Sequence, residues 1–419
     1  MKVLIVNSSD TQGGAARAAF RLSSFFQEKN IISRILVRKK SGHSHFAISL
    51  SRRLDKVWFI LGSQLGHFIS NFERTSKSTT RSVNLIPSRI FHRIQSTNAD
   101  IVNLHWVNEE TISVCQIGRI LKPTIFTLHD MWAFCGSEHY TEDRPDARFR
   151  SGYHRANREP GSTRIDIDRW TWKRKKKHWS QPRHVICPSH WLAQCAGESD
   201  LMREWPIHVI PNVLDTNCFK PMDKAFCRKA LGLTVGKRYI AYGAIGGASD
   251  PRKGFALLQK ALQELMAGSS KAELEAVVFG QSQPAVRPEL GLPINYMGHL
   301  HDDFSLALLY NAVDVMVVPS LQENLPQTGT EAQSCGTPVV AFNTTGLPDV
   351  VVHAATGYLA EPFSPEDLAA GIAWVLEDSE RYQQLSLAAR ERAVRLWSPE
   401  VVIPQYLEVY QRAIDEHQR

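Results

Sequence analysis

The sequence has 419 residues, 43% of them hydrophobic, which is enough for two ordinary domains with separate cores and excludes a single small module. Lys and Arg number 49 against 42 Asp and Glu, and the formal net charge of +7 favours anionic partners such as phosphates, nucleic acid or an acidic lipid surface. The seven cysteines are widely spaced and form no C-x-x-C pair, so they argue against a disulfide framework or a zinc site and for a reducing compartment.

The first residues, 1–7, read as a buried strand and lack the charged segment and apolar core of a secretory signal. No run in the sequence reaches the apolar length of a membrane span. Together with the cysteine pattern, these features predict a cytoplasmic protein. Peripheral contact with the inner face of the cell membrane is a further expectation.

Short β-branched runs alternate with helical patterns along the whole chain. They lie at 2–6, 34–37, 100–104, 124–128 and 184–188, and then at 208–212, 239–245, 274–280, 314–320 and 337–342. Continuous apolar runs of this length, separated by amphipathic segments, are typical of parallel sheets with helices on both faces. The sequence therefore predicts an α/β fold of two doubly wound, Rossmann-like domains facing across a cleft.

A polar segment at 196–206 separates the two series of runs and predicts the domain boundary. We expect the first domain at 1–206 and the second at 207–397. The tail, 398–419, opens with Ser-Pro-Glu, which is a typical helix start, and its apolar residues recur at helical spacing. This helix is expected to pack back on the first domain.

Gly13 and Gly14 form a turn between the first apolar run and a helical pattern. Two glycines let a ligand approach the backbone closely, and the start of a helix favours an anion. The turn does not match G-x-G-x-x-G, so a dinucleotide fingerprint has little support. A ligand-binding turn and a tight turn without a ligand are both open at this point.

An apolar stripe with helical spacing follows, beside Arg52, Arg53 and Lys56. Packing into the core is its first interpretation, and docking on a membrane is the second. Its members are Leu54, Val57, Trp58, Leu61, Leu65, Phe68 and Phe72.

Asp166 and Asp168 form a D-x-D pattern, and paired carboxylates of this kind can hold a divalent ion. The pair precedes a basic helical segment and does not follow a core strand. This position favours acids of a first helical turn that stabilise the helix dipole. We therefore expect no metal site here.

The segment Arg169–Trp179, RWTWKRKKKHW, interleaves five consecutive cations with three tryptophans. Such a mixture suits an anionic membrane surface, where each cation contributes about 1 kcal/mol and indoles lie at the headgroup level. Nucleic acid would be attracted by the same charges. A helix that covers the core with its tryptophans and exposes its cations is an equally good interpretation.

Arg252 and Lys253 lie in a loop between an apolar run and a helical pattern of the second domain. Ligands of doubly wound sheets bind at the carboxyl ends of the strands, where this loop is expected. Two fixed cations there can neutralise a departing diphosphate without a metal. A solvated pair of loop charges is the alternative, and it fits Arg252 better than Lys253.

Two glutamates, Glu323 and Glu331, stand eight positions apart where an apolar run gives way to a helical pattern. The helix is expected to begin at Pro326 or the next residue, because proline is favoured in a first helical turn. The amides of Asn324, Leu325 and the helix start would then face a phosphate. The two carboxylates would be left to hold hydroxyl groups on either side, as a nucleotide diphosphate sugar requires. Two solvated acids near a helix start are the alternative.

Several motifs together resemble a known family. They are ENLPQTGTEAxxCGTPVVA at 323–341, RKG at 252–254, VIPNVLD at 209–215, CPSHWLA at 187–193 and GGAA at 13–16. Over nearly its whole length the chain resembles the retaining glycosyltransferases of family four, which have the GT-B fold. The stretch TLHDMWAFCGSEHY at 127–140 is similar to the bacterial exopolysaccharide branch of the colanic acid type.

The resemblance implies roles for individual residues. Glu323 would hold hydroxyl groups of the donor hexose, Glu331 the ribose, and Lys253 with an arginine the diphosphate. His129 matches a histidine that lies near the donor sugar. A hydrogen-bonded structural histidine is the alternative, and the functional role is favoured because His129 ends a strand at the predicted cleft. The first domain would carry the acceptor, and the second would bind the donor.

The sequence departs from the family pattern at two places. Gly243-Ala244 stands where many relatives carry Gly-Arg, so the role of the arginine must fall to Arg252 or be absent. Cys135, Ser137 and Glu138 replace an expected threonine, glycine and cysteine, which puts the acceptor contacts of this loop in doubt.

The sequence thus predicts a retaining hexosyltransferase that uses a nucleotide diphosphate sugar and no metal. Its acceptor would be a lipid-linked saccharide in cell-surface polysaccharide synthesis, and nucleic acid is not an expected partner. A nucleotide-sugar-binding protein without turnover is one alternative. A nucleotide-dependent oxidoreductase is another, although the dinucleotide fingerprint is missing.

Overall fold

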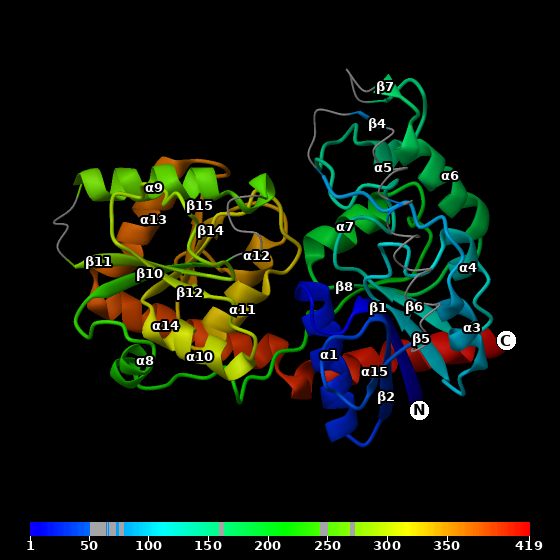
Figure 1. The fold of residues 1–419 in the computed structure, drawn as a ribbon, viewed down its shortest axis with the longest axis horizontal. Helices are drawn as coiled ribbons and strands as arrows, with labels where there is room; N and C mark the ends of the chain where they lie inside the picture. The colour runs from blue at the N-terminus through cyan, green and yellow to red at the C-terminus, as the bar shows by residue number, and fades with distance from the viewer. Residues whose placement is uncertain are drawn as a thin grey trace. The chain divides into compact units, whose positions relative to one another are not determined.

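The computed structural model describes residues 1–50, 79–158, 163–243, 250–268 and 273–419, together with residues 64, 66, 73 and 74. The chain divides into two compact units. The first comprises Met1–Asn212 and Ile403–Arg419, and the second comprises Val213–Val402. Figure 1 shows that each unit is built around one sheet with helices packed against it.

The sheet of the first unit is parallel throughout, in the order β3-β2-β1-β5-β6-β8-β9. Its strands are β1 (Lys2–Ser9), β2 (Ile32–Lys39), β3 (Ala47–Ser49), β5 (Ile101–Leu104), β6 (Thr124–Thr127), β8 (Val185–Cys187) and β9 (Ile207–Val209). The helices of this unit are α1 (Gly14–Glu28), α3 (Arg89–Ser96), α4 (Val114–Gly118), α5 (Arg148–Ser151), α6 (Ile167–His178), α7 (His190–Glu198) and α15 (Pro399–Gln418). Strands β4 (Glu73–Arg74) and β7 (Thr163–Arg164) pair antiparallel outside the sheet.

The sheet of the second unit is also parallel, in the order β12-β11-β10-β13-β14-β15. Its strands are β10 (Arg238–Gly243), β11 (Leu274–Phe279), β12 (Ile294–Gly298), β13 (Val315–Val318), β14 (Val339–Phe342) and β15 (Gly357–Ala360). The helices are α8 (Lys224–Ala230), the 3-10 helix η2 (Pro251–Lys253), α9 (Phe255–Gly268), α10 (Asp303–Ala312), α11 (Gln327–Ser334), α12 (Leu347–Val350), α13 (Pro365–Glu377) and α14 (Ser379–Trp397).

The central strands are apolar and buried on both faces. Every residue of β5, β6, β8, β13 and β14 is buried. A parallel sheet of this kind needs helices on each side, and for this reason continuous apolar runs predict it better than alternation does. The predicted α/β class with two doubly wound sheets is confirmed.

The boundary between the units differs from the prediction at 206/207. Strand β9 pairs with β8, with Val185 opposite Ile207, so the run at 208–212 opens no second sheet and instead completes the edge of the first. The polar segment at 196–206 is the connection from α7 to this edge strand, and the units divide after Asn212.

The last helix, α15, packs in the first unit. Nδ2 of Asn103 in β5 donates to the hydroxyl of Tyr410 at 2.7 Å, and both side chains are buried. At the far end of the helix, Nε2 of His184 lies 2.9 Å from the carboxylate of Glu416. Two further expectations concern the stripe from Leu54 to Phe72 and the residue Ala244, which lie outside the described residues.

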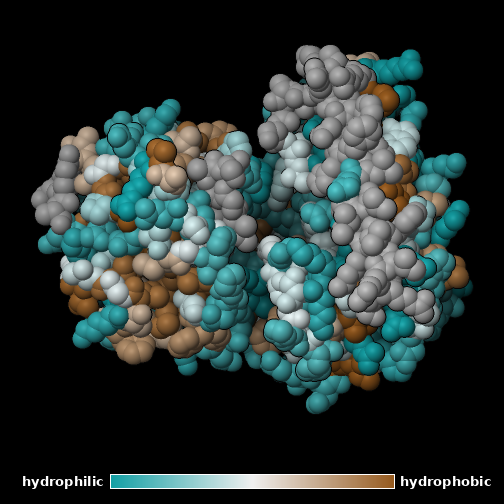
Figure 2. Space-filling view, in the orientation of Figure 1, coloured by the Kyte–Doolittle hydropathy of each residue, from teal (hydrophilic) through white to brown (hydrophobic). Residues whose placement is uncertain are grey.

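Apolar surface gathers on the second unit, where Figure 2 shows brown residues over the side that carries α8 and α10. Phe226 of α8 and Phe304 of α10 are each 59% exposed. In the part of the chain that the structure describes, no helix combines the length and hydropathy needed to cross a bilayer.

Candidate functional site

The strand order of the second sheet changes direction beside β10. Counted along the chain, the strands lie in the order third, second, first, fourth, fifth, sixth, so the connections diverge on either side of the β10–β13 pair. In open parallel sheets, ligands bind outside the carboxyl ends of the strands at such a point. The described segments that follow these two strands are η2 and the loop at 319–326.

These two segments are fastened to each other. The amide of Leu321 donates to the carbonyl oxygen of Arg252 at 2.8 Å, and the guanidinium of Arg252 donates to the carbonyl oxygen of Gln322 at 2.7 Å. Gly254 ends η2 with φ +70°, and a β-carbon there would collide with the carbonyl oxygen of Pro319. The left-handed backbone and the close approach both require glycine at this position.

Lys253 and Glu323 meet where the two segments join. Nζ of Lys253 donates to Oε1 of Glu323, which also accepts from the hydroxyl of Ser320 at 3.2 Å. Nη1 of Arg252 lies 3.5 Å from the same oxygen. Burial alone would raise the pKa of Glu323, but the two cations outweigh it and hold that pKa below its ordinary value.

The sequence analysis left Glu323 free for hydroxyl groups and treated the cations separately, whereas the structure joins them in one ion-paired cluster. The reason is the backbone contact between the two loops, which brings the side chains face to face. The side chains of Arg252 and Lys253 are each 25% exposed, so both cations can still reach a ligand.

The loop that follows β14 also holds the backbone of Glu323 in place. The amide of Glu323 donates to the hydroxyl of Thr345 at 3.0 Å, and the amide of Gly346 donates to the carbonyl oxygen of Glu323 at 2.9 Å. The α-carbon of Gly346 lies so close to the carbonyl oxygen of Asn324 that a β-carbon would not fit. Sequence reasoning missed these residues, although the Asn-Thr-Thr-Gly turn at 343–346, directly after the run at 337–342, was a signal.

Helix α11 begins at Gln327 with Pro326 as its N-cap residue, as predicted. Asn324 and Leu325 are 5% and 6% exposed. Glu331 is fully buried, and its Oε2 accepts from the hydroxyl of Tyr310 in α10 at 2.8 Å. Its role as a ribose ligand therefore stays a prediction.

The first sheet has its own point of divergence, between β1 and β5. Gly13 and Gly14 follow β1 at the start of α1, and Gly13 has φ +88°. A β-carbon on Gly13 would meet nothing within 4 Å, so the backbone conformation and not crowding requires this glycine. The amide of Gln12 donates to the hydroxyl of Ser9 at 3.1 Å and shapes the turn.

Two histidines follow neighbouring strands of this sheet. His105 comes after β5 and His129 after β6, and Nδ1 of His105 lies 3.0 Å from Nε2 of His129. Burial lowers the pKa of His129 to about 4 and lowers that of His105 well below its ordinary value. Both rings are therefore neutral near pH 7.

A second set of polar contacts holds the residue after His129. Oδ2 of Asp130 accepts from Nε1 of Trp106 at 2.8 Å and lies 2.6 Å from Nδ1 of His139. Nε2 of His139 lies 2.9 Å from the hydroxyl of Ser82. Sequence reasoning assigned no role to His105, Asp130 or His139, although Asn-Leu-His and Thr-Leu-His both end apolar runs and gave a repeated signal.

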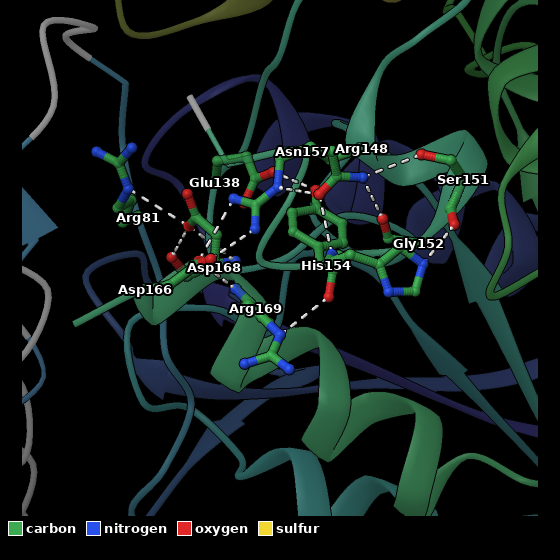
Figure 3. A network of polar contacts seen from close by, with 12 residues as sticks. Arg81, Glu138, Arg148, Ser151, Gly152, His154, Asn157, Asp166, Asp168 and Arg169 are labelled. Atoms are coloured by element: carbon green, nitrogen blue, oxygen red, sulfur yellow. Dashed lines mark hydrogen bonds and ion pairs between the residues drawn. The ribbon is translucent and has the colours of Figure 1, made fainter. Parts of the chain in front are cut away.

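The D-x-D pair belongs to a buried polar network, shown in Figure 3. Asp166 caps α6 by accepting from the amide of Arg169 at 2.8 Å, and it pairs with Arg148 at 2.6 Å. Asp168 accepts from the amide and hydroxyl of Ser137 and lies 3.4 Å from Nε of Arg81. The pair is thus found at the start of a helix, as predicted, and the described residues hold no group of three or more His, Cys, Asp or Glu placed to bind a metal.

The same network contains the residues that depart from the family pattern. Glu138 accepts from the hydroxyl of Tyr153, and burial together with the charge of Asp168 raises the pKa of Glu138 to about 8. Cys135, Ser137 and Glu138 are at most 6% exposed. Their side chains form the interior of this loop, so their packing accounts for the departure from the family pattern.

One face of the basic segment Arg169–Trp179 packs into the core. Trp172 and Trp179 are buried, and Lys175 is completely buried, with Nζ donating to the carbonyl oxygens of Trp132, Cys135 and Gly136. The expectation of five cations on a surface was therefore wrong for Lys175. Three carbonyl oxygens and the ring of Trp132, 3.9 Å away, replace the water around its ammonium group.

Three lysines of this segment remain exposed, namely Lys173, Lys176 and Lys177. Lys176 pairs with Asp200 at 2.9 Å. Arg174 instead donates to the carbonyl oxygens of Val83 and Asn84. The interpretation of a helix that covers the core with its tryptophans and exposes its cations therefore holds for Trp172 and Trp179 and for these three lysines, but not for Trp170, which is 38% exposed, or for Lys175.

The structure resembles known two-domain glycosyltransferases. It matches sucrose-phosphate synthase from Thermosynechococcus elongatus with a TM-score of 0.68 and 17% identity, covering 99% of this chain and 100% of that one. It matches HepE of Anabaena, solved with UDP and glucose, with a TM-score of 0.66 and 16% identity, covering 98% and 99% of the two chains. At such identities the likeness shows the fold.

Curated relatives match over part of their length. A D-inositol 3-phosphate glycosyltransferase of Segniliparus rotundus is 34% identical over 199 residues, which are 45% of this chain and 43% of that protein. A second, from Thermobispora bispora, is 28% identical over 227 residues, which are 51% and 52% of the two chains. The chain thus spans about half the length of the curated relatives it matches, and these relatives do not single out the exopolysaccharide branch.

Two family models match consecutive parts of the chain. Residues 12–217 match the model described as Glycosyltransferase Family 4, and residues 229–392 match the model described as Glycosyl transferases group 1. The first match covers most of the unit that carries His129, and the second covers the Lys253–Glu323 cluster. Together the two models match most of the chain, which is therefore similar to the family 4 and the group 1 glycosyltransferases, and the structural likeness shows the GT-B fold.

Proposed function

We propose that this chain transfers a hexose from a nucleotide diphosphate sugar to a hydroxyl group of a saccharide acceptor, with retention of configuration. The observation that carries the proposal is the Lys253–Glu323 pair, held at the carboxyl ends of β10 and β13 where the second sheet diverges. A cation and a carboxylate fixed side by side at a ligand crevice suit a substrate with a diphosphate next to sugar hydroxyl groups.

The chemistry follows from the charges. As the bond between the sugar and the diphosphate breaks, negative charge grows on the departing oxygens, and Lys253, Arg252 and the amides at the start of α11 stabilise it. Glu323 accepts from hydroxyl groups of the hexose and holds Lys253 in place. The acceptor hydroxyl attacks from the face that the diphosphate leaves, and the departing phosphate oxygen takes its proton. No metal takes part in these steps.

The donor and the acceptor are separate parts of the proposal. HepE, which has the same fold, was solved with UDP-glucose, so UDP-glucose is the first donor to test. For the acceptor we favour a lipid-linked saccharide of cell-surface polysaccharide synthesis. D-inositol 3-phosphate is the second candidate, because the matched relatives are named as its glycosyltransferases.

Membrane contact belongs to the same proposal. The exposed face of α6 carries Lys173, Lys176 and Lys177, with Trp170 38% exposed nearby. Cations beside an exposed indole suit an anionic lipid surface, and a lipid-linked acceptor would be met there.

Two rival functions give different results in one set of assays. A binding protein without turnover would be stabilised by nucleotide sugars but would neither hydrolyse nor transfer them. An oxidoreductase would be stabilised by nicotinamide dinucleotides, and the family match argues against it.

The test is a thermal-shift screen with UDP-, GDP- and ADP-sugars, because a ligand that binds the folded state raises its melting temperature. The best donor is then incubated with oligosaccharides on a lipid carrier and with D-inositol 3-phosphate. We expect one donor to stabilise the protein and its sugar to reach one acceptor with an unchanged anomeric configuration. Stabilisation by no nucleotide sugar, or an inverted product, would contradict the proposal.

A further inference from the structure

The two histidines at the carboxyl edge of the first sheet form a direct pair. The ring of His105 lies 5.1 Å from that of His129 between centroids, and a single contact of 3.0 Å joins Nδ1 of His105 to Nε2 of His129. The amide of His105 donates to the carbonyl oxygen of Val6 at 3.0 Å, which anchors the pair at the divergence of β1 and β5.

Because both rings are neutral, one of the two facing nitrogens carries the shared proton and the other accepts it. If His129 donates, then Nε2 of His105 must carry a hydrogen. If His105 donates, then Nε2 of His105 is bare and His129 carries its hydrogen on Nδ1. The two arrangements present opposite groups to a ligand, because Nδ1 of His129 is an acceptor in the first and a donor in the second.

The surroundings of His105 decide between them. His105 is 6% exposed, and its Nε2 is buried and has no hydrogen-bond partner in the part of the chain that the structure describes. A buried N–H without an acceptor is rarer than a buried acceptor without a donor. The arrangement with a bare Nε2 is therefore favoured, in which Nδ1–H of His105 donates to Nε2 of His129.

We propose that His105 is a positioning residue that fixes His129 in its Nδ1–H form, so that His129 offers a hydrogen-bond donor to an oxygen of a sugar that reaches the carboxyl edge of the first sheet. His129 is partly exposed whereas His105 is buried, so His129 is the ring of the pair that a ligand can meet. The contact with the sugar rests on the proposed function, whereas the tautomer does not.

The test begins without substrate. Nitrogen-15 NMR of the histidine-labelled protein at neutral pH distinguishes a protonated ring nitrogen from a bare one by its chemical shift. We expect His129 to be protonated on Nδ1 and bare on Nε2, and UDP-glucose to shift the Nδ1–H signal. A hydrogen on Nε2 of His129 would overturn the proposal, even if sugar transfer were found. Absence of transfer with the expected tautomer would count against the proposed function alone.

Two variants of His105 sharpen the test. In His105→Asn the amide nitrogen takes the place of Nδ1 and can still donate, so the tautomer and kcat/KM should be kept. His105→Leu should yield a mixture of tautomers and lower kcat about tenfold, the worth of one hydrogen bond, with little change in KM. An unchanged kcat for a folded His105→Leu protein would also overturn the proposal. If that protein fails to fold, the tautomer of His129 in the parent protein and in His105→Asn tests the proposal.

The chain offers a matched control. His184 and His208 form a similar pair, with Nδ1 of His184 2.9 Å from Nε2 of His208. His184 directly precedes β8, so it lies at the amino end of its strand, whereas His105 and His129 follow the carboxyl ends of theirs. His184→Leu should leave kcat and the tautomer of His129 unchanged, and a tenfold loss there would show that the effect of His105 is not specific.

Discussion

The α-carbon of Gly254 faces the carbonyl oxygen of Pro319 so closely that no β-carbon fits between them. This contact lets η2 lie against the loop after β13 and so brings Lys253 to Glu323. We expect Gly254→Ala to separate the two loops and to weaken binding of UDP-glucose strongly, because the ion-paired cluster loses its geometry. Isothermal titration calorimetry measures the binding, and urea unfolding measures the stability.

The matched control is Gly232→Ala. Gly232 has the same φ of +70°, but a β-carbon there would meet nothing within 4 Å. It should cost about 1–2 kcal/mol of stability, the strain of a left-handed alanine, and leave donor binding intact. Equal donor binding by both variants would show that the approach of Gly254 to Pro319 does not shape the site.

Lys253→Ala should lower turnover far more than it weakens donor binding. A cation aimed at a departing diphosphate acts mainly on charge that develops in the transition state, and losing one such group costs on the order of a hundredfold. The control is Lys260→Ala, because Lys260 is exposed on α9 of the same unit. Steady-state kinetics give the turnover of each variant, and calorimetry gives its donor binding. Full turnover by a folded Lys253→Ala protein would show that this lysine has no part in the mechanism.

The stability of the first unit should fall as the pH rises through the range in which Glu138 would ionise. Its folded pKa of about 8 lies above the ordinary value of 4.5, because of burial and the nearby charge of Asp168. Between these values the folded state holds a proton that the unfolded state has lost, so stability decreases from about pH 4.5 to 8. Glu138→Gln keeps an acceptor for Tyr153 without an ionisable group.

Urea unfolding at several pH values checks this expectation. The parent should lose stability between pH 5 and 8 relative to Glu138→Gln, and the difference should be largest at the alkaline end. Parallel pH profiles for the two proteins would show that Glu138 is ionised in the folded state at neutral pH.

The membrane proposal is tested by changing the exposed lysines alone. Lys173, Lys176 and Lys177 together changed to Gln should release the protein from vesicles that contain anionic lipid, while transfer to a soluble acceptor analogue continues, because about 1 kcal/mol per cation is lost. Vesicle sedimentation measures the binding. Vesicle binding that persists after this change would place the anchor elsewhere.

Two further variants complete that experiment. The control changes Lys220, Lys229 and Lys260, which are exposed on the second unit, to Gln and should bind vesicles as the parent does. Lys175→Gln should instead destabilise the first unit by about 2 kcal/mol or more, since buried carbonyl oxygens lose a donor. Stability unchanged in Lys175→Gln would contradict the burial of this lysine.

Transfer activity should survive EDTA. The diphosphate needs a positive partner, and Arg252 and Lys253 supply it at the carboxyl ends of the strands where it is expected. Asp166 is occupied with a helix cap and with Arg148, so Asp166→Asn should leave donor affinity near that of the parent. The test compares transfer rates with EDTA and after addition of Mg²⁺ or Mn²⁺. Activity that is abolished by the chelator and restored by either ion would contradict the role given to Arg252 and Lys253.

Sequence patterns predicted the interior of both sheets and failed at their edges. The central strands are buried on both faces and therefore appear as continuous apolar runs. The strands missed or assigned to the wrong sheet are β3, β9, β12 and β15, and each lies at an edge. Every residue of β12 is partly exposed, so its sequence mixes polar and apolar residues and resembles a loop.

The sequence located the candidate site but not its internal contacts. Lys253 and Glu323 were found because both follow apolar runs, and strand ends are where such sheets bind ligands. Their pairing joins positions 70 residues apart and depends on two loops meeting, which no local pattern records. Lys175 was expected on the surface but is buried. The carbonyl oxygens that surround it come from residues about 40 positions earlier, and no local pattern shows them.

The placement of α15 bears on how the chain is made. A ribosome synthesises Asn103 long before Tyr410, its partner across 307 positions, so the first sheet emerges without the helix that covers it. The second unit is translated in full during this interval and is contiguous, so it can complete its fold first. Asn103 lacks its partner until the last helix is made, and a chaperone that holds incompletely folded chains would find its substrate in this interval.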